Sequence, residues 1–310
     1  MLNRRRFAAL ATMGLASCRA LAGSENLSAP GAPALRRPIE QQLAELDRTS
    51  RGRLGVAILD TATGAHYAHR AHERFLLCST FKLLASAYVL RRVDRGQESL
   101  DRRIAYDATA LLSWSPVTEK HVADGMTLGA LCEAAITYSD NAAANLILAS
   151  YGGPPALTAF VRTLGDDVTR VDRTEPALNA HGHAGDMRDT TSPHAMLRSL
   201  QKLVLGDALS AASRTQLQQW LRANTTGEHR LKAGLPDGWT IGDKTGSFGR
   251  GDGGGTSNDV AVVWPPDGRA PLLVAAFLMD SAAPSAARDA TLASVGRLLP
   301  AIVVGAPRGG

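Results

Sequence analysis

Ser79 and Lys82 are the first residues whose types and spacing could perform chemistry. They stand three positions apart in Cys78-Ser79-Thr80-Phe81-Lys82, directly before an apolar run at 83–90. If this segment is helical, Ser79 lies in the first turn and Lys82 one turn later on the same face, with Cβ atoms roughly 5–6 Å apart. Free N–H groups at the helix start would stabilise a serine alkoxide, and a partly desolvated lysine could accept the hydroxyl proton. The segment therefore predicts a nucleophilic serine.

Spacing alone is a weak signal, because Ser199-Leu200-Gln201-Lys202 fits the same Ser-x-x-Lys pattern with no chemistry around it. A second motif, Ser139-Asp140-Asn141, precedes a helical run at 142–148. It would place a hydroxyl and an amide at the start of another helix, or it could be an ordinary N-cap.

Two later motifs offer further polar groups. Glu175 and Asn179 stand four residues apart in an irregular stretch, where together they could hold one water molecule or simply lie in a solvated turn. The motif at 244–247, Lys-Thr-Gly-Ser, ends a predicted edge strand and offers a cation and two hydroxyls, unless it is only a flexible turn. It lacks the adjacent Gly-Lys of a phosphate-binding loop.

Composition describes a globular chain with no nucleic-acid partner. The 310 residues are 45% hydrophobic and 20% charged, enough to bury a large core. The formal charge is +5, but the first 22 residues hold four arginines (4, 5, 6 and 19) and no acid, so the remainder carries 5 − 4 = +1. No basic patch interleaved with aromatic residues argues for nucleic-acid binding.

The N-terminus predicts export. Residues 1–22 resemble a twin-arginine signal peptide, with Asn3-Arg4-Arg5-Arg6-Phe7 followed by an apolar stretch too short to span a bilayer. Cleavage after Ala22 would release a periplasmic product with no stable membrane insertion. Lipidation at Cys18, within Leu15-Ala16-Ser17-Cys18, is the alternative.

The rest of the chain predicts two lobes. After a linker at 23–37, a catalytic domain at 38–305 begins with a helix at 39–46 and strands at 54–60 and 65–69. Mostly helical patterns follow, and strands return at 239–245, 259–264 and 272–279 before a helix at 285–299. We expect a sheet lobe (38–75 and 222–305), a helical lobe (76–221) and a functional cleft between them.

The four motifs, in this order, resemble those of the class A serine β-lactamases, and the resemblance covers roughly 53–299. It implies an α+β fold of the β-lactamase/transpeptidase type, with a five-stranded antiparallel sheet flanked by helices and an all-helical lobe. It also implies a monomeric, metal-free and cofactor-free hydrolase that opens penicillins and cephalosporins through a serine acyl-enzyme and so gives antibiotic resistance. The substrate spectrum, including carbapenems, stays open.

The resemblance assigns catalytic roles to matching positions. Ser79 would attack the β-lactam carbonyl, with an oxyanion hole formed by the backbone N–H groups of Ser79 and Ser247, and either Lys82 or Glu175 would accept its proton. Ser139 would pass a proton to the departing ring nitrogen. The catalytic set is Ser79, Lys82, Ser139, Glu175 and Asn179, the last two activating the deacylating water.

The same resemblance implies the substrate-binding residues. The substrate carboxylate would meet the 244–247 motif and Arg230, Trp114 would form a cleft wall, and an ion pair of Arg173 with Asp189 would brace the Glu175 loop. The binding set is Asn141, Lys244, Thr245, Gly246, Ser247, Arg230 and Trp114.

This chain also departs from the family pattern. The glycine-rich segment 248–257 is about four residues longer than the usual turn, which predicts a mobile floor of the cleft. Cys78 lacks the partner that serine carbapenemases have, because Phe248 occupies that place. Cys132 matches half of another family bridge whose second half is Ser86 here, so we expect no conserved disulfide.

Other functions remain as alternatives. A D-Ala-D-Ala peptidase or a non-hydrolysing penicillin sensor would share Ser-x-x-Lys and Lys-Thr-Gly, but neither needs Glu175 and Asn179. A zinc hydrolase would have to use His181, His183 and Asp186, whose spacing is one place off the usual pattern, and no further ligand set follows.

Overall fold

The computed structural model describes residues 32–181, 183 and 185–304. The predicted signal peptide at 1–22, Cys18 and most of the predicted linker lie outside the described residues. Within the described part of the chain, no helix has the length and apolar character needed to cross a membrane.

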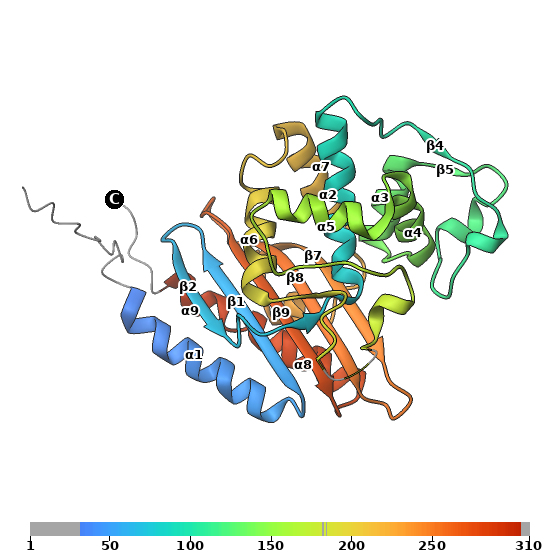
Figure 1. Ribbon diagram of the computed structural model, residues 1–310. Helices are drawn as coiled ribbons and strands as arrows, with labels where there is room; N and C mark the ends of the chain where they lie inside the picture. Colours follow the sequence, from blue (N-terminus) through green and yellow to red (C-terminus); the bar gives the residue numbers. More distant parts are fainter. Residues whose placement is uncertain (1–31, 182, 184, 305–310) are drawn as a thin grey trace, which may run out of the picture.

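A five-stranded antiparallel sheet organises the molecule, in the order β2-β1-β9-β8-β7. Its strands are β1 (Arg53–Asp60), β2 (Ala65–His69), β7 (Thr240–Gly249), β8 (Gly255–Trp264) and β9 (Leu272–Ser281). Figure 1 shows the two ends of the chain, blue and orange to red, forming this sheet. The prediction of one sheet built from both chain ends is confirmed.

One face of the sheet packs on helices from the two chain ends. Side chains alternate between the faces of a strand, so Leu54, Val56 and Ile58 of β1 point to this side and pack with Leu43 and Leu292 in one apolar cluster. The helices that cover it are α1 (Ala32–Thr49), α8 (Ser285–Gly296) and α9 (Leu299–Val304).

The other face packs on the helical lobe, drawn mainly in teal to yellow in Figure 1. Its helices are α2 (Phe81–Asp94), α3 (Leu128–Thr137), α4 (Asn141–Ser150), α5 (Gly153–Thr163), α6 (Pro193–Val204) and α7 (Ala211–Arg222). Two short antiparallel pairs join neighbouring segments: β3 (Phe75–Leu76) with β6 (Thr190–Thr191), and β4 (Arg103–Ile104) with β5 (Met126–Thr127). Single 3₁₀ turns lie at Cys78–Thr80, Ala108–Ala110, Thr118–Lys120, Ala177–Asn179 and Leu231–Gly234.

Three predicted boundaries differ from the structure. Helix α1 begins at Ala32, so 32–37 are helix rather than linker, because the alanine, leucine and arginine residues there are strong helix formers. Ser79 lies in the 3₁₀ turn that precedes α2, not in the first α-helical turn. The helix predicted at 285–299 ends at Gly296, where a Cβ would lie 2.3 Å from the carbonyl oxygen of Leu231, and a separate helix begins at Leu299.

The glycine-rich segment 248–257 forms a shorter turn than predicted. Strands β7 and β8 continue their pairing down to Gly249 and Gly255, which leaves only 250–254 as the turn. The Arg250 N–H donates to the Gly254 carbonyl at 2.8 Å, and the Gly254 N–H donates to the Asp252 carboxylate at 2.9 Å. A Cβ at Gly255, where φ is +156°, would lie 2.0 Å from the Phe248 carbonyl oxygen. The glycines therefore let two strands extend in close contact.

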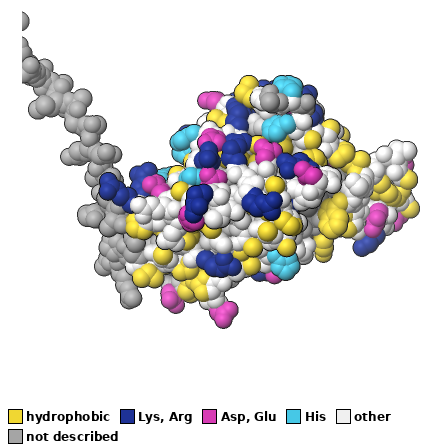
Figure 2. Space-filling view, turned by 90° about the horizontal axis from the view of Figure 1, so that it is seen from below, with side chains coloured by type: hydrophobic (Ala, Val, Ile, Leu, Met, Phe, Trp, Pro, Cys, Tyr) yellow, Lys and Arg dark blue, Asp and Glu magenta, His cyan; other side chains and the backbone are white. Residues whose placement is uncertain are grey.

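Neither cysteine in the described part of the chain forms a disulfide: Cys78 and Cys132 are free and buried, as expected. On the surface, basic and acidic side chains are interspersed on the face shown in Figure 2. This mixture agrees with the nearly neutral charge calculated beyond the first 22 residues.

Candidate active site

The nucleophile candidate Ser79 lies where the sheet lobe meets the helical lobe. It sits in the 3₁₀ turn between β3 and α2, and its neighbour Cys78 has a φ of +43°, a conformation that residues other than glycine rarely adopt. The Ser79 Oγ donates to Glu175 Oε1 at 3.3 Å. A serine hydroxyl therefore lies beside a carboxylate that can accept its proton.

Lys82 is completely buried and faces three acceptors. Its Nζ donates to the Ser139 carbonyl oxygen at 2.8 Å and to Asn141 Oδ1 at 2.6 Å, and it forms an ion pair with Glu175 Oε1 at 3.2 Å. Burial lowers the pKa of the Lys82 amine, while the Glu175 carboxylate opposes that shift. Among the described contacts, Ser79 Oγ is bonded to Glu175 rather than to Lys82.

The loop that carries Glu175 is held from two sides. The Asn145 side chain of α4 accepts from the Glu175 N–H at 2.9 Å and donates to its carbonyl oxygen at 2.9 Å. Arg173 pairs with the fully buried carboxylate of Asp189, as expected. Asn179 Nδ2 donates to Glu175 Oε2 at 2.6 Å, and Asn179 Oδ1 is buried without a partner in the described part of the chain.

The Ser139-Asp140-Asn141 motif both caps a helix and contributes to the site. Asp140 is the N-cap of α4, accepting from the Ala143 N–H at 2.8 Å, so the ordinary capping interpretation holds for this residue. Ser139 has a φ of +58°, and its Oγ accepts from Lys244 Nζ at 3.0 Å. Asn141 contacts Lys82 as described above.

The Lys244–Ser247 motif lies inside β7, not at its end, at the edge of the sheet. Lys244 is completely buried, and its burial together with the positive charge of Lys82 lowers the pKa of its amine well below the usual value. Gly246 passes close to the nucleophile turn, because a Cβ there would lie 2.9 Å from the Leu77 carbonyl oxygen. The absence of a side chain lets the strand approach Ser79.

Arg230 reaches the same edge of the sheet. Its guanidinium donates to Ser247 Oγ at 2.6 Å, to the Gly246 carbonyl oxygen at 2.9 Å and to the Asn258 carbonyl oxygen at 2.7 Å. An ion pair with Asp289 of α8 at 2.9 Å fixes its orientation. The guanidinium is therefore positioned beside Ser247, ready to meet an anion.

These residues surround one cleft of about 320 Å³. Trp114 forms an outer wall: its side chain is exposed (63%), it has a φ of +64°, and its indole N–H donates to the Tyr138 carbonyl oxygen at 2.9 Å. Lys82, Glu175 and Lys244 are buried beneath the lining. The lining residues are Ser79, Trp114, Ser139, Asn141, Asn179, Thr226, Arg230, Thr245 and Ser247.

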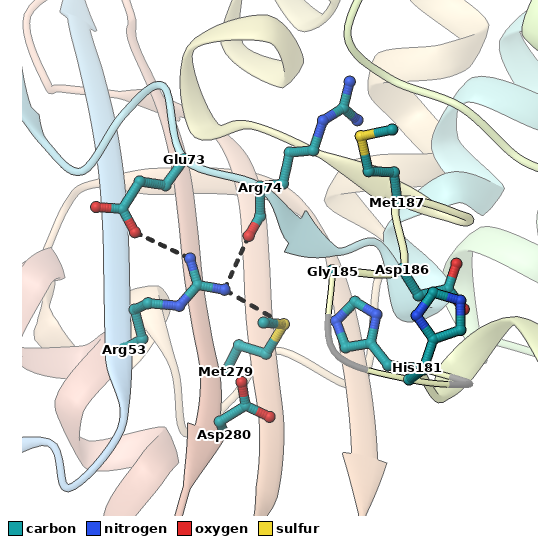
Figure 3. A pocket seen from close by; sticks show the side chains of 10 residues that line it. Arg53, Glu73, Arg74, His181, Gly185, Asp186, Met187, Met279 and Asp280 are labelled. Carbon is teal, nitrogen blue, oxygen red and sulfur yellow. Dashed lines mark hydrogen bonds and ion pairs between the residues drawn. The ribbon is translucent and has the colours of Figure 1, made fainter.

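A larger cavity of about 560 Å³ lies elsewhere, between the starts of β1 and β3, the end of β9 and the segment around Met187. Figure 3 shows Arg53 at its centre, donating to Glu73 at 2.9 Å and to the Arg74 carbonyl oxygen at 2.9 Å. His181, His183 and Asp186 also line it, but the described residues include no group of histidine, cysteine and acidic side chains arranged to hold a metal ion. Among the described residues that line it there is no serine, threonine, cysteine or lysine, so the smaller cleft is the candidate active site.

Three residues of the site were missed from the sequence. Thr226 lines the cleft and forms a hydrogen bond with the Thr245 hydroxyl. The Asn145 side chain forms hydrogen bonds with the backbone of Glu175. Asp289 forms the ion pair that orients Arg230. Asn145 stands four residues after Asn141 on one helix face, a spacing that could have drawn attention to it. Nothing in the sequence pairs Arg230 with Asp289, 59 positions later.

The fold and the cleft together define an enzyme of the serine hydrolase class. The protein-family model described as "Beta-lactamase enzyme family" matches residues 38–303 of this chain. The β-lactamase L2 of Stenotrophomonas maltophilia is 46% identical over 304 residues, covering 96% of this chain and 98% of that protein. The carbapenem-hydrolysing β-lactamase KPC of Klebsiella oxytoca is 46% identical over 267 residues, or 86% and 89% of the two chains.

Solved structures agree with these relatives. An ancestral class A β-lactamase (GNCA) is 59% identical, with a TM-score of 0.81, covering 85% of this chain and 99% of that one. The chain belongs to the β-lactamase enzyme family and is a class A serine β-lactamase.

Proposed function

We propose that Ser79 is the nucleophile with which this enzyme opens the β-lactam ring of penicillins and cephalosporins. The observation that carries the assignment is the cluster of Ser79, Glu175 and Lys82 at the base of the cleft, with Oγ and Nζ both contacting Glu175 Oε1, at 3.3 and 3.2 Å. Attack by Oγ forms an acyl-enzyme and breaks the ring C–N bond. The oxyanion is stabilised by the backbone N–H groups of Ser79 and Ser247.

Glu175 is the base that accepts the Ser79 proton in this proposal. The direct Oγ–Oε1 contact supports it. Lys82 Nζ contacts Ser139, Asn141 and Glu175, and as an ammonium it has no lone pair with which to accept the Ser79 proton. Its charge stabilises the Glu175 carboxylate and the alkoxide that develops beside it.

Ser139 returns a proton to the departing ring nitrogen. Lys82 contacts both Glu175 Oε1 (3.2 Å) and Ser139 Oγ (3.4 Å), and Lys244 donates to the same hydroxyl at 3.0 Å. The proton taken up by Glu175 therefore passes through Lys82 and Ser139 to the ring nitrogen, which leaves Glu175 as a carboxylate before deacylation. Asn141 holds Lys82 and binds the substrate side-chain amide. The substrate carboxylate meets Arg230, Ser247, Thr245 and Lys244 at the edge of β7, where Gly246 keeps the strand close to Ser79, and Trp114 forms the opposite wall.

Deacylation completes the cycle. Glu175 and Asn179 hold the hydrolytic water. Asn179 Nδ2 donates to Glu175 Oε2, while the buried Asn179 Oδ1 is available to accept a hydrogen bond from that water. Glu175 then takes the water proton as the hydroxide attacks the ester. This pair distinguishes the enzyme from a peptidase or a sensor that stays acylated.

We also propose that the mature protein is a periplasmic monomer formed by the domain at 38–305, after twin-arginine export and removal of residues 1–22. Neither metal nor cofactor enters the reaction. A broad substrate spectrum is consistent with 46% identity to a relative named as carbapenem-hydrolysing.

The test compares the parent protein, lacking residues 1–22, with Glu175→Gln on a chromogenic cephalosporin, following trapped adduct by intact mass. We expect turnover by the parent. In the variant both steps lose their base, but the strained β-lactam still acylates Ser79 slowly whereas the unstrained ester persists, with deacylation slowed by about 10²–10⁴-fold, the usual range for a lost general base.

Glu119→Gln is the matched control, because this exposed glutamate lies in the helical lobe outside the cleft lining. It should turn over as the parent does, with no adduct. Turnover by Glu175→Gln within threefold of the parent would remove Glu175 from the mechanism, and an adduct that persists on the parent would favour the peptidase or sensor alternative.

A further inference from the structure

Two buried carboxyl groups lie under the active site and have no part in the mechanism above. Asp243 of β7 directly precedes Lys244, and Asp259 lies on the neighbouring strand β8. The strand register pairs Asp243 with Ala261 and Asp259 with Thr245, so the two acids are diagonal neighbours across the strands, within side-chain reach. Both side chains are buried, at 3% and 0% exposure.

The hydrogen bonds around these carboxyl groups leave one oxygen without a donor. Asp243 Oδ2 accepts from Asn224 Nδ2 at 2.6 Å, and Asp259 Oδ2 accepts from the Leu231 N–H at 3.2 Å. Asp259 Oδ1 is buried without a donor in the described part of the chain. Asp259 Oδ1 is therefore the oxygen that remains for a contact with its diagonal neighbour Asp243.

A hydrogen bond between two carboxyl groups requires a proton. Ionised carboxylates only accept hydrogen bonds, and two of them in contact repel. Burial raises the pKa of Asp243 to about 6, and burial together with the Asp243 charge raises the pKa of Asp259 well above its usual range. Both shifts favour holding a proton in the pair, and the neighbouring charge of Asp243 favours the neutral form of Asp259.

The surrounding chain is closely fitted to this arrangement. Gly227 packs over Asp243, since a Cβ at that position would lie 2.2 Å from Asp243 Oδ2. Only glycine lets the loop before Arg230 cover the carboxylate so closely. The pair is thus enclosed between the sheet and this loop, and its charge acts on its neighbours in surroundings of low dielectric.

The charged groups that face the pair are cations of the active site. Lys244 on β7 and Arg230 from the loop lie next to it, Lys82 of α2 lies beyond Lys244, and Asp289 of α8 is engaged by Arg230. The charges of Lys82 and Arg230 favour the neutral form of the buried Lys244 amine, whereas the two aspartates favour its charged form. A single negative charge on the two aspartates would therefore oppose the two positive charges of Lys82 and Arg230.

We propose that Asp243 and Asp259 share one proton and act as a positioning pair, whose single negative charge keeps Lys244 cationic for binding the substrate carboxylate. The inference rests on the proposed role of Lys244 in substrate binding. Removing the charge would let Lys244 lose its proton at lower pH, so the alkaline limb of kcat/KM would move to lower pH. The change would raise KM more than it lowers kcat, because the anionic substrate would then meet a neutral Lys244 amine.

Two variants separate the charge from the side-chain shape. In Asp259→Asn the amide can still donate to Asp243 and accept from Leu231, so the single charge stays. We expect its pH profile to match the parent's and its kcat/KM to stay within about twofold. Asp243→Asn/Asp259→Asn removes the charge, and we expect its alkaline limb to move down by about one pH unit, with KM raised about tenfold above that limb.

Infrared difference spectra at neutral pH test the proton directly. The parent should show the C=O band of a protonated, buried carboxylic acid, and the band should be absent from Asp259→Asn, which can be measured even if the double variant fails to fold. Asp280→Asn, at the exposed end of β9, is the control and should change neither the band nor the profile.

Absence of the band from the parent would overturn the shared proton. An alkaline limb displaced in Asp259→Asn as far as in the double variant would show that both carboxylates are ionised and would also overturn it. Because the band does not depend on turnover, its presence in a parent whose mechanism proved different would separate failure of the proposed function from failure of this inference.

Discussion

The two faces of the central sheet bury very different side chains. Toward α1 and α8 the strands present mainly apolar residues such as Leu54, Ile58 and Val263, packed in one cluster, and the alternation along β7 and β8 puts Asp243 and Asp259 on this side near the sheet edge. On the side of the helical lobe, the site at the same edge buries Lys82 and Lys244 at 0% exposure. Burying apolar surface stabilises the fold, whereas burying charge costs free energy unless each group is paired. The apolar cluster stabilises the fold, and the charged groups at the β7 edge position the chemistry.

Three residues at the cleft also have strained backbone conformations, and positive φ values occur at five further residues other than glycine in the described part of the chain. Cys78, Trp114 and Ser139 have φ values of +43°, +64° and +58°, conformations that cost free energy for residues with a Cβ. All three belong to the cleft or flank its nucleophile. Strain of this kind persists only where the surrounding structure holds it, and here the packed sheet supplies that support.

Replacing the nucleophile should cause the largest loss of activity and little loss of folding stability. Ser79→Ala removes a partly buried hydroxyl that donates to Glu175, so kcat for a cephalosporin should fall by about 10⁴-fold or more while the unfolding midpoint stays near the parent's. Steady-state kinetics and thermal unfolding measure the two quantities.

The chain offers a matched control in the second Ser-x-x-Lys segment. Ser199 on α6 donates to Asp166 at 3.0 Å and is buried, away from the cleft lining. Ser199→Ala should lower the free energy of unfolding by about 1 kcal/mol, the worth of one hydrogen bond, and leave kcat unchanged. Equal losses of activity in both variants would mean that Ser79 acts through stability rather than chemistry.

Truncating the opposite face should give the reverse pattern. Leu54 on β1 is fully buried in the cluster beneath α1, so Leu54→Ala should lower the free energy of unfolding by about 2–5 kcal/mol through lost apolar contact and the cavity left behind. Denaturant unfolding measures this loss. The kcat of the folded fraction should stay within about twofold, and a tenfold fall would show that the two faces are coupled.

The contrast between the faces also explains what the sequence could predict. Strands β1, β2 and β9 were predicted within a few residues because apolar runs and a Thr61–Gly64 turn indicate them directly. The residues of the cleft were predicted because four motifs in order resemble a family. The extension of β7 and β8 was missed, since Gly249 and Gly255 are typical of a turn when read alone.

What the sequence could not predict depends on register and on three-dimensional fit. Asp243 and Asp259 are 16 positions apart, and only the diagonal across β7 and β8 brings them together. Asp289 is likewise matched to Arg230 only by the packing of α8 beside the 3₁₀ turn at Leu231–Gly234. Positive φ at Ser139 or Trp114 has no sequence signal, because neither residue type favours that conformation.

A smaller loss of stability than that of Leu54→Ala is expected when the brace of the Glu175 loop is removed. Asp189 is fully buried and accepts from the backbone N–H groups of Asp172 (2.7 Å) and Arg173 (3.0 Å) as well as from the Arg173 guanidinium. Arg173→Ala should therefore lower the free energy of unfolding by about 2 kcal/mol, the range for a hydrogen bond to a charged group, because the carboxylate keeps its two backbone donors.

The same variant separates bracing from general stability. Because Arg173 adjoins the loop that orients Glu175, Arg173→Ala should slow deacylation and raise the steady-state fraction of acyl-enzyme, measured by intact mass during turnover. Arg36→Ala is the control: its pair with Glu40 on α1 is exposed, is worth only about 0.3–0.5 kcal/mol and lies on the apolar-face side. If Arg173→Ala lost stability without accumulating acyl-enzyme, Asn145 alone would suffice to hold Glu175, and the ion pair would belong with the residues that stabilise the fold.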